Sequence, residues 1–217
     1  MDAFRDYFSS LDTAAMLRAA LRLVAVLLCL TVHETCHGLA ALALGDPTAK
    51  SERRLSLNPL HHVDWMGLAA MLLLGFGWAK PVPVDMRYFK NPKRGMALTA
   101  LAGPASNLAF AFLALLGVRA VLYHAPDAAA WEWVYVFLLL LARMNVGLGV
   151  FNLLPISPLD GSKVLFALLP DAAYERLMRV ERYGFFLLYA LLFFGALDGF
   201  LGRAVSAVFT AMAELIF

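Results

Sequence analysis

Long apolar runs dominate this sequence and limit the folds that are open to it. Stretches long enough to cross about 30 Å of hydrocarbon occupy residues 14–44, 95–123, 131–154 and 184–202. Hydrophobic residues make up 62% of the 217 residues and charged residues only 16%, so lipid is the natural solvent for most of the chain. We therefore expect an all-α polytopic membrane protein with about four to six transmembrane helices.

A shorter apolar run, residues 65–78, is followed closely by Pro81 and Pro83. It is short for a full crossing, and two prolines two residues apart cannot lie inside a helix. The pattern predicts a re-entrant segment that leads into a small β element, with the prolines on an edge strand. The C-terminal stretch 204–217 is too short to span and is expected to lie in the membrane interface.

Lysine and arginine gather in three segments between the apolar runs, which indicates the side of the membrane that these segments face. They are Lys50, Arg53 and Arg54; Lys80, Arg87, Lys90, Lys93 and Arg94; and Arg176, Arg179 and Arg182. The connection 124–130 carries neither residue type, so the three basic segments are predicted to be cytoplasmic. Arg18, Arg22 and Arg119 run against this rule. The net charge of +2 is small and divided among short clusters, so nucleic acid is not an expected partner.

One short motif carries the chemistry. In His33-Glu34-Thr35-Cys36-His37 the two histidines are four residues apart, so on a helix both imidazoles project from one face and can bind one zinc ion. Glu34 would flank the metal as the base that activates water. The alternative is a pair of histidines satisfied by hydrogen bonds in a helix bundle, but two histidines and a glutamate are costly to bury in a membrane without a role.

A catalytic zinc site needs a third protein ligand from elsewhere in the chain. The candidates are Asp46, Asp64, Asp160, Asp198, His61, His62 and His124, with Cys36 as a weaker alternative because it points about 60° away from His33. Asp160 stands out, because Pro155 and Pro158 would unwind the end of a membrane helix and deliver one carboxylate at membrane depth. Its alternative role is the N-cap of a short helix over 162–169.

Several motifs in order resemble the site-2 protease family of intramembrane zinc metalloproteases. Residues 33–38 are similar to the first motif of the family, and residues 152–161 to the second, with Ser157 where the family often has proline. Similar connecting segments occur at 45–50, 57–60, 77–84 and 102–107. The resemblance is to the compact bacterial and archaeal form, a single domain over 1–217 in a prokaryotic cell membrane without PDZ or CBS domains. It implies one zinc ion per chain, held by His33, His37 and Asp160.

The resemblance also implies the reaction. The substrate would be a membrane protein whose transmembrane segment is cut near the cytoplasmic face. Asn152 is our first choice for the donor that stabilises the oxyanion, since a side-chain amide offers hydrogens without a buried charge. The alternative is that Asn145 and Asn152 only tie helices together. Asn107 is expected in packing or in support of a ligand, and Arg143 is an intramembrane arginine whose partner the sequence does not name.

Two other functions are open at this point. A non-catalytic membrane scaffold could retain the fold, but the intact set His33, Glu34, His37 and Asp160 argues against it. A metal transporter typically shows repeated halves and charges spread over several helices. This chain shows no repeat, and its candidate ligands converge on one site. The oligomeric state is not indicated by the sequence.

Overall fold

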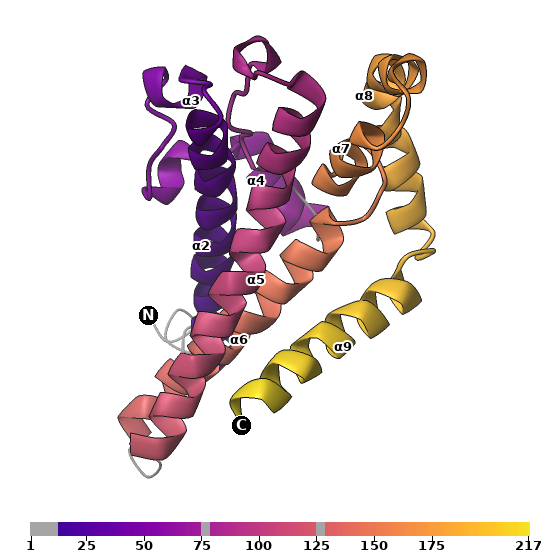
Figure 1. Ribbon diagram of the computed structural model, residues 1–217. Coiled ribbons are helices and arrows are strands. Elements are labelled where there is room, and N and C mark those ends of the chain that lie inside the picture. Colours follow the sequence, from indigo (N-terminus) through magenta and orange to yellow (C-terminus); the bar gives the residue numbers. More distant parts are fainter. Residues whose placement is uncertain (1–12, 75–78, 125–128) are drawn as a thin grey trace, which may run out of the picture.

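The structure is a computed structural model that describes residues 13–74, 79–124 and 129–217, and helices account for its regular elements (Figure 1). In chain order these are α2 (Thr13–Ala43), α3 (Thr48–Ser51), η1 (Pro59–His61), α4 (Trp65–Leu74), η2 (Met86–Tyr88), α5 (Pro92–His124), α6 (Ala129–Asn152), α7 (Asp160–Ala167), α8 (Asp171–Phe193) and α9 (Asp198–Ile216). The prediction of an all-helical chain is confirmed for the described residues.

Four helices of the described part are long and apolar enough to cross a membrane: Ala14–Ala43, Pro92–His124, Trp131–Asn152 and Asp198–Ile216. The number agrees with the lower limit of the prediction. Most of the large side chains on these helices face outwards, as they do in a chain whose solvent is lipid. The protein is therefore an integral membrane protein.

Helix α5 lies at the centre of the bundle and packs against α2, α6 and α7. The small buried residues Ala100, Gly103, Ala111 and Ala114 let the neighbouring helices approach closely. Membrane helices associate through this kind of contact, because lipid provides no hydrophobic force between them. The apolar core around Cys29, Ala114, Leu115 and Leu141 joins α2, α5 and α6, and the C-terminal part of α9 covers it.

The C-terminal third differs from the prediction in two ways. The apolar run 184–202 is not one span, because a turn at 194–197, in which Gly195 adopts a φ of 65°, divides it between α8 and α9. Residues 204–217 are not a separate interfacial segment, because they continue α9, which has 19 residues and is itself a candidate span. The hydropathy of the run hides the break, since glycine is tolerated inside apolar membrane helices.

The small β element is also corrected. No strand occurs in residues 13–74, 79–124 or 129–217, and the only pairing there is a single bridge between Val63 and Ala79. The extended pairing is limited because Pro81 and Pro83 lack backbone N–H groups, while the Val82 N–H is donated to the Glu34 carboxylate.

The basic segments lie together at one end of the helix bundle (Figure 1). The end of α2 and the starts of α5 and α8 lie at one end of the bundle, whereas the end of α5 and the start of α6 lie at the other (Figure 1). Two arginines that the sequence left unexplained contact α9. Arg119 donates to the carbonyl of Ile216 in the last turn, and the Arg143 guanidinium lies 6.0 Å from the Phe209 ring centroid, in a cation–π contact.

Asp46 ties the turn after α2 to the segment before α5. Its side chain is fully buried and accepts hydrogen bonds from the Thr48 N–H at 2.9 Å and from the Asp85 N–H at 2.7 Å. These bonds occupy Asp46 structurally, so this candidate ligand from the sequence has a role away from the metal.

We predict that Asp46→Ala destabilises the protein by about 2–4 kcal/mol, because it leaves the half-buried N–H groups of Thr48 and Asp85 without their acceptor. Thermal unfolding of the detergent-solubilised chain measures this. The control is Glu175→Ala, which removes an exposed carboxylate 3.6 Å from Arg179 and should change stability little. Equal unfolding midpoints for the two variants would contradict the assignment.

Candidate metal centre

The two histidines of the motif lie one turn apart on α2, as the helix repeat requires. Both are buried, and their Nε2 atoms are 2.9 Å apart. The sequence places these atoms on one face, and the fold then turns that face towards α5, α6 and α7 rather than towards lipid.

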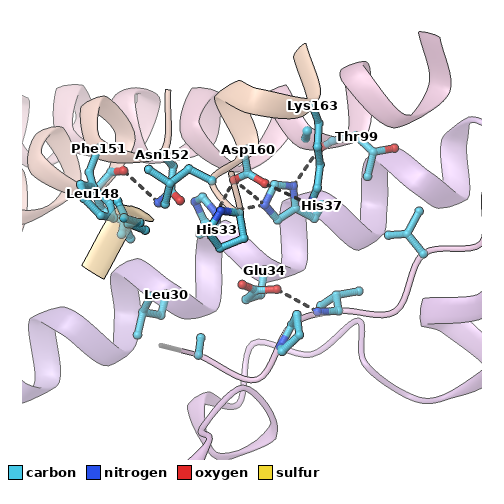
Figure 2. A pocket seen from close by; sticks show the side chains of 18 of the residues that line it. Leu30, His33, Glu34, His37, Thr99, Leu148, Phe151, Asn152, Asp160 and Lys163 are labelled. Carbon is cyan, nitrogen blue, oxygen red and sulfur yellow. Dashed lines mark hydrogen bonds and ion pairs between the residues drawn. The ribbon is translucent and has the colours of Figure 1, made fainter. Parts of the chain in front are cut away.

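Asp160 joins them from the other side of the bundle. Its Oδ2 atom is 3.1 Å from Nε2 of His33 and 3.2 Å from Nε2 of His37 (Figure 2). The carboxylate does not cap a helix, since α7 begins at Asp160 itself after Leu159, and no side chain caps it. Among the described histidines, cysteines and acids, His33, His37 and Asp160 are the group whose ligand atoms come close enough to hold a metal ion. The other third-ligand candidates and Cys36 are not in it.

The outer nitrogen of each imidazole is fixed by a hydrogen bond. His37 Nδ1 donates to the Thr99 carbonyl at 2.7 Å. His33 Nδ1 lies 2.6 Å from Oδ1 of Asn107, whose amide nitrogen in turn donates to the Cys29 carbonyl and to Asn145 Oδ1. Because the Asn107 amide nitrogen faces two acceptors, its oxygen is the atom that faces His33, and Nδ1 is the donor. Both histidines therefore carry a lone pair on Nε2.

Three acceptor atoms thus converge without a donor between them. Two lone pairs and a carboxylate oxygen within 3.2 Å repel one another unless a cation lies among them. Ligands of a tetrahedral zinc site, each about 2.0–2.1 Å from the metal, are separated by roughly 3.3 Å. The observed separations of 2.9–3.2 Å are close to this value, so the donor set fits zinc in both chemistry and spacing.

The charge state of Asp160 suits a metal ligand. Asp160 lies outside the four candidate spans. A metal ligand must be deprotonated, and a carboxylate anion is the form of Asp160 that would bind a cation. Its second oxygen, Oδ1, lies 3.9 Å from the Lys163 ammonium, one helical turn further along α7.

Glycines allow the close packing around the centre. A Cβ atom on Gly103 of α5 would lie 2.4 Å from Nε2 of His37 and 2.7 Å from Cε1 of His33. A Cβ atom on Gly161 would lie 2.2 Å from the Leu153 carbonyl, so the chain can return beneath α6 and present Asp160 only with glycine there.

The centre opens on a cavity of about 400 Å³ between α2, α5, α6 and α8. Glu34 and Asn152 both line it (Figure 2). Glu34 is half-buried and accepts a hydrogen bond from the Val82 N–H at 2.9 Å. Asn152 donates to the Leu148 carbonyl of its own helix, whereas Asn145 is fully buried and bonded to Asn107. The alternative that both asparagines only tie helices together therefore fits Asn145, which joins helices, whereas Asn152 lines the cavity.

Three contributors to the site were not singled out from the sequence. Thr99 acts through its carbonyl, which any residue would provide, so no signal could have identified it. Gly103 appeared only within a segment similar to the family. Lys163 lies three residues after Asp160, a spacing that places both on one helical face and could have indicated it.

These features define a class: an integral membrane protein with a buried His-His-Asp metal centre beside a carboxylate. Comparison with known proteins then gives the family. The profile of Peptidase family M50 matches residues 117–195, a region that includes Asp160. The candidate zinc metalloprotease YwhC of Bacillus subtilis is 39% identical over 166 residues, which are 75% of each chain. The candidate zinc metalloprotease Rip2 of Mycolicibacterium smegmatis is 31% identical over 176 residues, which are 79% of this chain and 66% of that protein. No solved structure matches the chain.

The chain therefore belongs to peptidase family M50, the site-2 protease family, as the resemblance in the sequence indicated. It is a zinc metalloprotease of this family, and His33, His37 and Asp160 form its metal-binding group.

We predict that Gly103→Ala weakens zinc binding at least about tenfold, because the new methyl group must displace an imidazole that Thr99 holds in place. Zinc content and competition with a chromogenic chelator measure this. Gly147→Ala is the matched control, since a Cβ atom at Gly147 of α6 meets nothing within 4 Å. Unchanged zinc affinity in Gly103→Ala would contradict the packing described above.

Proposed function

We propose that this chain is an intramembrane protease that hydrolyses peptide bonds within or near transmembrane segments of other membrane proteins. The observation that carries the proposal is the location of the metal-binding group and Glu34 on one cavity enclosed by apolar, membrane-spanning helices. His33 lies ten residues before the end of α2, which places it about 15 Å below that end of the helix. A soluble peptide would have to enter the bundle to reach this depth, whereas a transmembrane segment is already there.

Zinc, when bound, supplies Lewis acidity that polarises the scissile carbonyl and lowers the pKa of water. Glu34 is the residue of this chain that is placed to move the proton. It comes directly after His33 on α2, faces the cavity, and accepts only one hydrogen bond from the described residues, from the Val82 N–H. The carboxylate oxygen that does not bond Val82 can accept a proton from water and pass it to the leaving amine.

Asn152 is proposed to stabilise the oxyanion that develops during hydrolysis. One of its two amide hydrogens is donated to the Leu148 carbonyl, so the other is available on the cavity side. Asn145 is not proposed for this role, because it is buried between α5 and α6 and engaged with Asn107.

The segment 79–84 lies along the same cavity and is proposed to hold the substrate. A transmembrane helix must unwind before it is cut, since its amides are shielded by helical hydrogen bonds. Pro81 and Pro83 have no N–H, and the Val82 N–H is bonded to Glu34, so the carbonyl groups of residues 81–84 are the more available partners for an unwound peptide.

The membrane orientation is proposed from charge. The basic segments lie at the end of the bundle where α2 ends and α5 begins, and the positive-inside rule assigns this end to the cytoplasm. The ten residues of α4 extend about 15 Å, half of a bilayer core, which supports a re-entrant placement for it.

We predict that Glu34→Gln lowers the cleavage rate of a single-span membrane protein by about 10²–10⁴-fold while zinc stays bound, because the amide cannot accept a proton. Purified wild type, Glu34→Gln and chelator-treated protein would be compared by gel shift of the substrate and by zinc content. Glu175→Gln, far from the cavity on an exposed surface, is the control. Transport of zinc into vesicles without cleavage by wild type would instead support a transporter.

We also predict that Asn152→Ala lowers kcat by about a hundredfold with a small change in KM, because the lost donor acts mainly in the transition state. Asn152→Asp should lose as much activity, since a carboxylate offers no hydrogen at neutral pH. If Asn152 only ties helices, the alanine variant will unfold at lower temperature while the folded fraction keeps its kcat.

A further inference from the structure

A second cavity, of about 570 Å³, lies apart from the metal centre and shares no lining residue with the cavity of that centre. It is formed by the turn after α3, the η1 to α4 connection and the start of the 79–84 segment. The lining residues are Glu52, Arg53, Arg54, Leu60, His61, Val63, Asp64, Trp65 and Lys80. Three of them carry a permanent positive charge, and none of these three forms an ion pair within the described part of the chain.

Arg54 is held firmly in the wall of this cavity. Only 8% of it is exposed, and its Nη2 donates to the Lys80 carbonyl at 2.8 Å. The Lys80 N–H in turn donates to the His62 carbonyl at 2.9 Å. The Nε atom of Arg54 is also buried, and it finds no acceptor among the described residues. A buried guanidinium without a paired anion is costly, and the three cations of the lining outnumber its two carboxylates, Glu52 and Asp64.

The backbone conformation of Arg53 brings two consecutive arginines into the lining of this cavity. Arg53 has a φ of 56°, in the left-handed region that residues with a side chain rarely adopt. Strain of this kind costs about 1–3 kcal/mol and persists where the surrounding structure requires it. The turn allows two consecutive arginines to line one cavity, whereas consecutive residues in regular structure would point apart.

The edge of the cavity is apolar. Leu60 is 67% exposed and Trp65 is 74% exposed, and both belong to the lining. Figure 1 shows that α3 lies beside the end of α2, and we place this end of the candidate span at the membrane surface. Tryptophan and leucine beside basic residues at this level are typical of the headgroup layer. A free phosphate ion would need no such edge, but the glycerol and first acyl carbons of a lipid would cover it.

We propose that this cavity binds the headgroup of a membrane phospholipid, with the phosphate held by Arg53, Arg54 and Lys80 and the glycerol region against Leu60 and Trp65. The carboxylates of Glu52 and Asp64 in the same lining disfavour a headgroup with several negative charges and favour one that also carries an ammonium group, such as phosphoethanolamine. The bound lipid would fasten the loop end of the bundle to one leaflet. This proposal does not depend on the protease reaction.

The test uses the purified full chain in detergent, titrated with short-chain phosphatidylethanolamine, phosphatidylcholine and inorganic phosphate in separate arms. Binding is followed as a shift in the thermal unfolding midpoint. We expect wild type to be stabilised most by phosphatidylethanolamine, and Arg53→Gln with Lys80→Gln to need at least about tenfold more of it, because two charge-assisted hydrogen bonds are lost.

The matched control is Lys90→Gln with Arg94→Gln, which removes the same charge outside the cavity and should titrate like wild type. Lys80→Gln alone, at an exposed side chain, serves if the cavity double variant does not fold. Identical lipid titrations of wild type and the cavity variants would overturn the proposal. Equal saturation by inorganic phosphate would overturn the assignment to a lipid.

Discussion

The structure depends on one constraint: three electron-rich atoms that repel one another are held close together at membrane depth. Nε2 of His33, Nε2 of His37 and Oδ2 of Asp160 lie within 3.2 Å of one another, and each is oriented by the rest of the chain rather than by its neighbours in the site. A cation removes the repulsion, and zinc suits nitrogen and carboxylate ligands at this spacing. The bundle is therefore a scaffold that holds the three ligand atoms at the spacing that a zinc ion requires.

Helix α5 provides most of that scaffold. Its Thr99 carbonyl and Asn107 side chain accept the two Nδ1 hydrogens, and Gly103 between them leaves room for both imidazoles. Thr99, Gly103 and Asn107 follow one another at four-residue intervals, so they form one stripe along the helix that faces α2. Supporting groups of this kind fix the tautomer and the angle of each ligand, and they account for much of the affinity of a metal site.

The polar residues proposed for catalysis and those with structural roles lie in different places. Asn107 and Asn145 are fully buried and bond each other across α5 and α6, which suits polar groups that join membrane helices. Glu34 and Asn152 instead face the cavity and keep hydrogen-bonding capacity unused by the described residues. Two arginines of the spans are also accommodated by packing, Arg143 on the Phe209 ring and Arg119 at the end of α9.

The sequence by itself determined what depends on neighbours along the chain. The four-residue spacing of His33 and His37 fixes their common face, and the apolar composition fixes α2, α5 and α6 as spans, because both follow from local geometry and solvent preference. Only the tertiary structure decided that Asp160 meets the histidines instead of capping α7, that Asn107 and Thr99 orient them, and that the last apolar run breaks at 194–197. These outcomes depend on how distant segments pack, and that free energy is absent from any short window of sequence.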